Sequence, residues 1–368
     1  MIKGILTSIL MTTAICTLAQ NDIANSIDSI MRQRYPVDEP GAAILIMKGD
    51  SIVMEGYYGL ADLETKEPIS RDTRFNIASI SKQFTVVGVL QQVAKGKIDI
   101  NQCILDYCPQ FTKSFWRDIK LWHLMSHTSG LPDSRDRSNR QVTVVATDET
   151  SMSYFPSVDS LRFTPGAYYD YMNPTFILLA KVIESVTGID FITYQQKNIF
   201  NRAGMTTAYY FNPAQHPKNT AHGYITDETG QWIEYDYGEE TFFATRPDGG
   251  IYATARDLAS WEKALREGLI IPNELLNTAY SPFVSVSESH LCDYQRRPNT
   301  YYGLGWFIDT SREDTKVYHT GDNGGFQAYL AKYPSKDITI IVLENRNDYD
   351  RWQLATTIDQ LIFGTLCD

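Results

Sequence analysis

The chain has 368 residues, of which 43% are hydrophobic, and its formal net charge is -11. A chain of this length and hydrophobic content can bury a large core, which argues against intrinsic disorder. An acidic surface repels phosphate backbones, which argues against nucleic acid as a partner.

The N-terminus has the pattern of an export signal. One cation, Lys3, precedes an apolar run from Gly4 to Ala19 that ends in small residues. The run is short for a membrane span, so we expect residues 1–19 to be a signal peptide and the mature protein to be periplasmic or secreted. An uncleaved anchor is the alternative. After cleavage, no remaining stretch is long enough to cross a bilayer.

Four cysteines follow the signal: Cys103, Cys108, Cys292 and Cys367. In an exported chain they permit three disulfide pairings, and the sequence does not choose among them. Buried or free thiols are an equally good interpretation.

A helix and a hairpin are predicted at the start of the mature chain. Apolar spacing indicates an amphipathic helix over Asp22–Arg34, and two apolar strands follow, Ala43–Met47 and Ser51–Gly56. The next helix is predicted over Ile80–Ala94, although its interior Gly88 costs roughly 1 kcal/mol relative to alanine.

The rest of the chain changes character twice. From Ile98 to about Thr220 helices and loops dominate, whereas after His222 strand patterns return. Several elements are predicted in this part: a short helix beginning at Leu121, a helix over Phe176–Glu184, a capped helix over Asp257–Arg266, strands over Val317–Thr320, Phe326–Tyr333 and Ile338–Leu343, and a final helix over Asp350–Leu366.

This order of elements predicts an α/β (α+β) fold. We expect one antiparallel sheet formed by both termini and flanked by helices, with an inserted, mostly helical lobe. The sheet lobe would comprise about 20–75 and 222–368, and the helical lobe about 76–221. A cleft between the two lobes is the natural place for a site.

The helix over Ile80–Ala94 begins next to a possible nucleophile. Ser79 lies at its N-terminus, where unpaired N–H groups and the helix dipole stabilise an anionic centre by about 0.3 to 1 kcal/mol. Lys82 lies one turn later on the same face, within reach of the Ser79 hydroxyl. A lysine whose pKa is lowered by burial can serve as the base that a serine nucleophile needs.

The Ser-x-x-Lys pattern alone is weak, because about one or two such matches arise by chance in a chain of this length. A second match, Ser260 and Lys263, falls inside the helix capped by Thr254 and Asp257. Ser79 itself could be a simple N-cap, with Lys82 as a solvated charge.

Two further stretches supply what Ser79 lacks. A turn-rich loop from Phe163 presents Tyr171 and Asn173 just before a helix, and His319-Thr320-Gly321 ends a predicted strand. A glycine at that place lets a ligand approach the strand edge. A competing Tyr-x-Asn match begins at Tyr210, but no comparable Pro-Gly loop precedes it.

With these three motifs in this order, the sequence resembles the serine β-lactamase and penicillin-binding-protein superfamily, in particular its class C-like branch. That branch contains β-lactamases, DD-carboxypeptidases, esterases and D-amino-acid peptidases. The resemblance extends from about Ile27 to Phe363 and includes the stretches Leu124–Pro132, Pro165–Asn173 and Gly249–Trp261. It implies a β-lactamase/transpeptidase-like fold for one serine hydrolase domain over residues 20–368.

The resemblance implies a role for each catalytic position. Ser79 would attack a carbonyl and become acylated, while Lys82 and Tyr171 share the removal of its proton and the protonation of the leaving group. How these two residues divide the work stays open. Asn173 would bond to Lys82 or to the substrate amide.

The strand motif would complete the site. His319, in place of a lysine, would orient Tyr171 or contact the substrate, with Thr320 and Gly321 beside it as substrate-binding residues. The oxyanion would be held by the backbone N–H groups of Ser79 and Asp322, each contributing about 2.7 to 4 kcal/mol to the transition state. The resemblance implies no metal and no organic cofactor.

Two residues suggest the substrate class. An unperturbed His319 is largely neutral at pH 7, and Asp322 adds a negative charge beside the acyl pocket. Both would weaken attraction for a free carboxylate, so we expect an ester, amide or peptide hydrolase with weak or no β-lactamase activity. The alternatives are a DD-carboxypeptidase or β-lactamase, and a binding or sensor protein that does not turn over. The partner would be a small molecule or peptide, and the oligomeric state is left open.

Other conspicuous residues receive structural interpretations. His123 and His127 are expected to cap or satisfy buried backbone groups rather than bind metal, because no carboxylate completes a ligand set nearby. The arginine-containing loop Ser134–Arg140 is expected to be solvated. Tyr302 and Trp306 would line either the cleft or the core.

Overall fold

The computed structural model describes residues 22–133, 147–212, 217–236, 245–288 and 297–364. The predicted signal peptide, the loop 134–140, Cys292 and Cys367 lie outside these ranges. Cys103 and Cys108 are free thiols. Within the same ranges, no helix is both long enough and apolar enough to span a bilayer.

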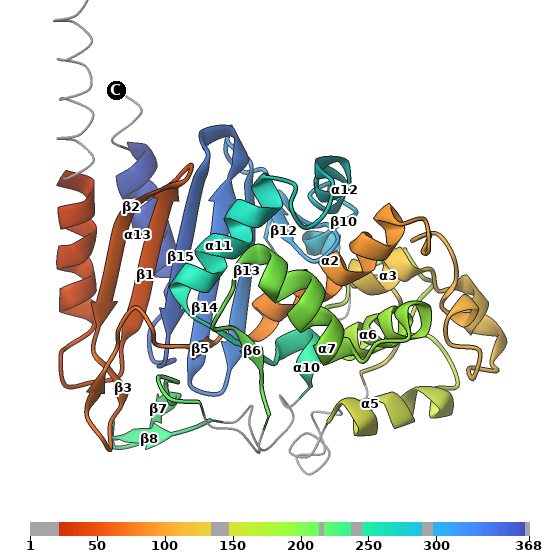
Figure 1. The fold of residues 1–368 in the computed structure, drawn as a ribbon, viewed down its shortest axis with the longest axis horizontal. Coiled ribbons are helices and arrows are strands. Elements are labelled where there is room, and N and C mark those ends of the chain that lie inside the picture. Colours follow the sequence, from red (N-terminus) through yellow and green to blue (C-terminus); the bar gives the residue numbers. More distant parts are fainter. Residues whose placement is uncertain (1–21, 134–146, 213–216, 237–244, 289–296, 365–368) are drawn as a thin grey trace, which may run out of the picture.

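An antiparallel sheet of eight strands, in the order β10-β11-β12-β13-β14-β15-β1-β2, forms the frame of the molecule (Figure 1). The strands are β1 (Ala42–Lys48), β2 (Ser51–Tyr58), β10 (Val284–Ser285), β11 (Thr300–Tyr302), β12 (Phe307–Asp309), β13 (Lys316–Asn323), β14 (Phe326–Tyr333) and β15 (Ile338–Glu344). Strand β1 pairs with β15, so that Ala42 lies opposite Glu344. The prediction that both ends of the chain build one antiparallel sheet is therefore confirmed.

The two faces of the sheet bury separate apolar clusters because side chains alternate along each strand. Ile44 and Val342 face a cluster that includes Ile27, on a helix over residues 22–34, and Ile358, on α13 (Arg351–Gly364). Leu45 and its neighbours on that side face the larger cluster. Coverage on both faces explains why the central strands read as continuous apolar runs.

The larger cluster is covered by the helices at the centre and on one side of Figure 1. They are α2 (Ser81–Ala94), α3 (Leu121–Met125), α5 (Asp148–Tyr154), α6 (Thr175–Thr187), α7 (Phe191–Gln195), α8 (Asn201–Ala203), α10 (Arg246–Gly249), α11 (Ala255–Arg266) and α12 (Asn273–Ala279). The cluster contains Leu330 from the sheet together with Phe84 and Phe176 from the helical region. The division into two lobes stays a prediction.

Helix α2 tolerates its interior glycine because α6 packs directly against it. A Cβ at Gly88 would lie 2.8 Å from Cδ1 of Ile183 and 2.9 Å from the side-chain nitrogen of Gln195. The residue that lowers helix propensity is thus the one that permits the close α2–α6 contact.

Three small sheets complete the fold. They are β3 (Leu60–Asp62) with β4 (Glu67–Pro68), β7 (Tyr224–Thr226) with β8 (Trp232–Glu234), and a three-stranded sheet of β5 (Phe75–Asn76), β9 (Ile251–Ala253) and β6 (Tyr209–Tyr210). The last one leads directly into the site, since β5 precedes the turn that carries Ser79. The two-residue strand β6 was not predicted because it is too short to show a period.

Candidate active site

Ser79 lies on a short 3-10 turn, η1 (Ala78–Ile80), immediately before α2. Ala78 has a φ of +45°, which costs roughly 1–2 kcal/mol for a residue other than glycine. The side-chain oxygen of Asn76 accepts the N–H of Ala78 at 2.7 Å and so holds this turn. Ala78 and Ile80 are buried, whereas Ser79 is partly exposed.

Lys82 is fully buried, and its amine touches the candidate nucleophile. Its Nζ lies 2.9 Å from Oγ of Ser79 and donates to the backbone carbonyl of Asp248, also at 2.9 Å. A neutral amine at this distance can take the hydroxyl proton directly. Ser79 is therefore not a simple N-cap, and Lys82 is not a solvated charge.

The ring of Tyr171 lies beside the amine of this pair. The Nζ of Lys82 is 5.0 Å from the centroid of the Tyr171 ring and 5.4 Å from that of Phe176. The side-chain oxygen of Asn173 is buried and has no hydrogen-bond partner among the described residues. The structure thus brings together the serine, the lysine and the tyrosine ring. Their catalytic roles stay predictions.

Strand β13 runs against the turn that carries Ser79. A Cβ at Gly321 would lie 2.3 Å from the carbonyl oxygen of Ile77 and 3.0 Å from Cβ of Ala78. Only glycine allows this approach. Gly321 therefore places Thr320 and Asp322, its neighbours on β13, next to η1.

His319 is buried and both of its ring nitrogens are engaged within the protein. Nδ1 donates to the carbonyl of Thr320 at 2.7 Å, and Nε2 accepts the hydroxyl of Tyr302 at 3.0 Å. Burial lowers the pKa of His319 to about 3. The ring is therefore neutral, and its centroid lies 6.3 Å from that of Tyr171.

The carboxylate of Asp322 is paired, in contrast to our expectation of an added negative charge beside the acyl pocket. The guanidinium of Arg351 donates to both carboxylate oxygens at 2.5 Å and to the carbonyl of Gly321 at 2.9 Å. Arg351 comes from α13, far along the chain, so nothing near Asp322 in the sequence indicated the pair. The oxyanion role of the Asp322 backbone N–H stays a prediction.

Several residues that shape the site were missed or left open. Asp248 offers its backbone carbonyl to the amine of Lys82, and a backbone contact leaves no pattern in a sequence. Tyr302 and Trp306 are both buried in the core, although Tyr302 also fixes the ring of His319. Asn76 could have been recognised as a turn residue before a helix.

The competing motifs are not sites. Lys263 is on the surface and forms ion pairs with Asp50 at 3.6 Å and Glu267 at 3.7 Å. Tyr210 is buried in β6, where it pairs with Ile251.

The two central histidines satisfy backbone groups, as predicted. Nδ1 of His123 accepts the N–H of Lys120 at 3.0 Å, and Nδ1 of His127 accepts that of Met172 at 2.9 Å. Within the described ranges, one group of histidine and carboxylate ligand atoms has a spacing compatible with a metal, with all atoms within 4.8 Å of one another. It consists of His222, Glu234 and Asp236 and includes neither central histidine.

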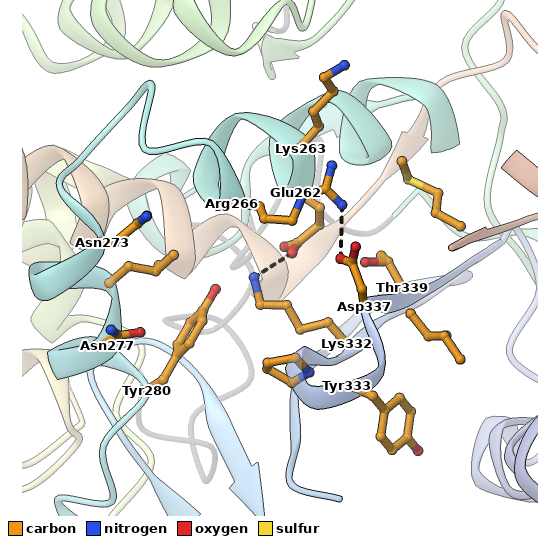
Figure 2. A pocket seen from close by; sticks show the side chains of 14 residues that line it. Glu262, Lys263, Arg266, Asn273, Asn277, Tyr280, Lys332, Tyr333, Asp337 and Thr339 are labelled. Atoms are coloured by element: carbon orange, nitrogen blue, oxygen red, sulfur yellow. Dashed lines mark hydrogen bonds and ion pairs between the residues drawn. The ribbon is translucent and has the colours of Figure 1, made fainter. Parts of the chain in front are cut away.

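A hollow of about 260 Å³ opens between α11, α12 and the β14–β15 connection, and none of the candidate site residues lines it. Figure 2 shows Lys332 directed toward Glu262, with a contact of 2.7 Å, and Arg266 directed toward Asp337, with a contact of 3.0 Å. These charges are compensated within the hollow itself, so it is a poor alternative to the Ser79 site.

The fold and the site together define a protein of the serine β-lactamase and penicillin-binding-protein superfamily. The profile of the family described as Beta-lactamase matches residues 27–362, so the chain belongs to this family. Members of this superfamily are generally serine hydrolases. The family expected from the motifs is thus confirmed.

Individual relatives have low sequence identity to this chain but align over most of its length. The chain is similar to penicillin-binding protein 4* of Bacillus subtilis (strain 168), with 25% identity over 344 residues, covering 87% of this chain and 72% of the relative. It is also similar to protein Flp of Staphylococcus aureus (strain NCTC 8325 / PS 47), with 26% identity over 89% of this chain. The chain spans 64% of the length of Flp, somewhat less than two thirds.

Two solved structures have the same fold. The octameric penicillin-binding protein homologue from Pyrococcus abyssi superposes with a TM-score of 0.79 and 24% identity, covering 94% of this chain and 77% of that one. The penicillin-binding protein from Bacillus halodurans superposes with a TM-score of 0.78 and 27% identity, covering 90% and 99%. The predicted fold class is therefore confirmed.

Proposed function

We propose that this chain is an exported serine hydrolase that forms an acyl-enzyme at Ser79 and cleaves an ester, amide or peptide bond. The observation that carries the proposal is the 2.9 Å contact between the buried amine of Lys82 and Oγ of Ser79. A surface lysine keeps its hydration shell, whereas this one is fully buried, and burial favours the neutral form of an amine.

The reaction would proceed in two proton-balanced steps. The amine takes the proton of Ser79 as Oγ attacks the carbonyl, and the leaving group departs with a proton delivered by Lys82 or Tyr171. A water molecule then attacks the ester carbonyl and gives one proton to Lys82 or Tyr171. That group passes the proton to Oγ as the bond between the carbonyl carbon and Oγ breaks, which releases the acid and restores the Ser79 hydroxyl. Donors at the backbone of Ser79 and Asp322 would hold the oxyanion in both steps.

The strand beside Ser79 favours substrates without a free carboxylate. Its histidine, His319, is neutral, and both ring nitrogens are engaged by Tyr302 and Thr320. The guanidinium of Arg351 is engaged by Asp322. A carboxylate placed along β13 would therefore meet no dedicated cation from these residues, which supports weak or no β-lactamase activity.

The second candidate is a penicillin-binding DD-peptidase or sensor. Two of the similar proteins are named for penicillin binding, and the catalytic serine of such a protein would be acylated by penicillin. A DD-peptidase would release D-alanine from a D-alanyl peptide. A sensor would keep the penicillin adduct without turnover.

A substrate panel tests the proposal. We expect hydrolysis of p-nitrophenyl butyrate or a D-amino-acid amide, with nitrocefin turned over well below the usual enzyme range of about 10⁴ to 10⁸ M⁻¹s⁻¹. Ser79→Ala should lower the rate by about 10⁶-fold. The matched control is Ser260→Ala, in the competing motif, which should leave the rate unchanged.

Other results would replace the proposal. Efficient nitrocefin turnover would identify a β-lactamase, and D-alanine release alone a DD-carboxypeptidase. A stable penicillin adduct without any hydrolysis would identify a sensor. Equal losses in Ser79→Ala and Ser260→Ala would sink the assignment of the site.

The proposal that the protein is exported rests on the N-terminal sequence pattern. Identifying the N-terminus of the mature protein tests this proposal. After expression in a bacterial host with a periplasm, we expect the protein in the periplasmic fraction or the medium, with a mass that corresponds to cleavage near Ala19. An intact N-terminus in the membrane fraction would favour the uncleaved anchor.

A further inference from the structure

His127 is a buried residue that the proposed reaction does not use. Its side chain is fully buried, and its backbone φ is +58°. Few residues other than glycine adopt this left-handed conformation, although histidine does so more often than most. Two hydrogen bonds of His127 lead to the loop that carries Tyr171.

Two backbone hydrogen bonds end on His127, one from each side of Tyr171. The N–H of Asp170 donates to the carbonyl oxygen of His127 at 2.8 Å. The N–H of Met172 donates to Nδ1 of His127 at 2.9 Å. One residue therefore holds the peptide groups before and after the tyrosine.

The imidazole also packs against the tyrosine ring itself. The two ring centroids are 4.2 Å apart, with planes inclined by 34°. Tyr302 contacts the same imidazole, with centroids 4.8 Å apart. The ring of His127 thus fills the space beside the phenol of Tyr171 and restricts its rotation.

This arrangement requires a neutral imidazole. Nδ1 can accept the N–H of Met172 only when it carries no proton, so the proton of the ring is on Nε2. Burial lowers the pKa of His127 well below its usual value. Nε2 is buried and has no hydrogen-bond partner among the described residues.

Further hydrogen bonds join the residues that follow His127 to the residues that precede Asp170. The N–H of Gly166 donates to the carbonyl of Thr128 at 2.8 Å, and the N–H of Arg162 donates to that of Gly130 at 2.7 Å. The segment 127–130 therefore supports the loop 162–172 over its length, and His127 is the point at which the support reaches Tyr171.

We propose that His127 is a positioning residue that holds the Tyr171 phenol in place beside Lys82 and Ser79. The proposal rests on the proposed function, because it assumes that Tyr171 moves a proton in the reaction. Among the described residues, no hydrogen bond joins His127 to Ser79.

Three variants separate its contributions. His127→Ala removes the acceptor and the ring, and should lower kcat for p-nitrophenyl butyrate by about 10²-fold with little change in KM, the effect of a small misplacement of a catalytic group. His127→Asn keeps an acceptor near the Nδ1 position and tolerates positive φ, so it should recover part of the loss. The control His123→Asn removes a buried ring of the same kind that does not contact Tyr171, and should leave kcat unchanged.

A double-mutant cycle decides whether His127 acts through Tyr171. In a Tyr171→Phe background, His127→Ala or His127→Asn should cause almost no further loss of kcat, because the phenol they would misplace is already absent. Loss by the same factor in both backgrounds would overturn the proposal, as would an unchanged kcat in His127→Ala. If His127→Ala does not fold, His127→Asn is compared in the two backgrounds.

Hydrogen exchange provides a readout that does not depend on activity. The amides of Asp170 and Met172 should exchange faster in His127→Ala than in the wild type, and should be unaffected in His123→Asn. If the wild type hydrolyses none of the substrates, the proposed function fails, while faster exchange still supports the positioning role. Unchanged exchange in His127→Ala would overturn the positioning role even in an active enzyme.

Discussion

At the scale of single residues, the proposed chemistry depends on how Lys82 is held. Its amine is fixed between Oγ of Ser79 and the carbonyl of Asp248, each at 2.9 Å. Two fixed partners leave the amine little freedom, so it is already in place when the hydroxyl must lose its proton.

Replacing Lys82 with methionine tests this arrangement. Lys82→Met keeps the length of the side chain and removes the amine, so we expect kcat to fall by about 10² to 10⁴-fold, the usual contribution of an acid or base group. The matched control is Lys263→Met, because Lys263 belongs to the second Ser-x-x-Lys motif and lies on the surface. Both variants should be measured with the same ester. A similar loss in both would contradict the assigned role.

Three short motifs pointed to Ser79, Lys82 and Tyr171, which the structure brings together, while their catalytic roles stay predictions. What the sequence could not predict are the partners from distant segments. Arg351 pairs with Asp322 from the last described helix, and the amine of Lys82 donates to the backbone carbonyl of Asp248. Neither contact leaves a local pattern, since only the tertiary fold brings these residues together.

At the scale of elements, the site depends on the contact between β13 and η1. The strand approaches so closely that a Cβ at Gly321 would lie 2.3 Å from the carbonyl oxygen of Ile77. An ordinary side chain would therefore push apart the two elements that carry Ser79 and the strand motif.

The variant Gly321→Ala tests this contact. We expect kcat to fall by about 10²-fold or more and stability to fall by about 1–3 kcal/mol, since either β13 or η1 must move. Gly364→Ala is the control, because a Cβ there meets no atom of the described residues within 4 Å. Circular dichroism melting and ester kinetics would report both effects. Full activity in Gly321→Ala would show that the close approach is not needed.

Element boundaries were predicted to within a few residues wherever the pattern was local. The capped helix was expected over Asp257–Arg266 and is observed as α11 (Ala255–Arg266), with Thr254 accepting from the N–H of Asp257. The turn η1 was not predicted, because it depends on the positive φ of Ala78, which the tertiary structure imposes.

At the scale of the whole molecule, buried histidines couple stability to pH. Burial lowers the pKa of His319 to about 3 and that of His123 to about 4, and places that of His127 well below its usual value. In the unfolded chain each would titrate near its ordinary value of about 6.5. At pH values between these limits the unfolded chain binds more protons, so stability falls as pH falls from about 6.5 toward 4.

His222 acts in the opposite direction. The carboxylates of Asp236 and Glu234, with Asp62 nearby, raise its pKa to about 9. Its stabilising contribution is complete below about pH 6.5 and is lost as pH rises toward 9. The side chain is partly exposed, so the effect is screened and smaller than that of the buried histidines.

We therefore expect stability to decline on both sides of neutral pH. Urea unfolding midpoints from pH 4 to 9 would measure it, with a slope of up to about 1.4 kcal/mol per pH unit for each histidine that titrates only in the unfolded chain. His123→Asn should flatten the acid side, and His222→Gln the alkaline side. If the stability of these variants changed with pH as steeply as that of the wild type, the assignment of the two declines to His123 and His222 would be contradicted.

The overall architecture could be predicted because both ends of the chain carry apolar strands around a helical middle. The order of strands could not be predicted in full, since the pairing of β1 with β15 joins residues about 300 positions apart along the chain. The side chains that form the large cluster come from both predicted lobes. The lobe boundaries therefore stay a prediction.

The most direct test of the central claim is to map a covalent serine label. After reaction with a fluorophosphonate, peptide mass spectrometry should find one adduct per chain, on Ser79, absent from Ser79→Ala and retained in Ser260→Ala. Slower labelling in Lys82→Met than in the wild type would support activation of the Ser79 hydroxyl by the amine. An adduct on another serine, or none on a folded wild-type protein, would contradict the account.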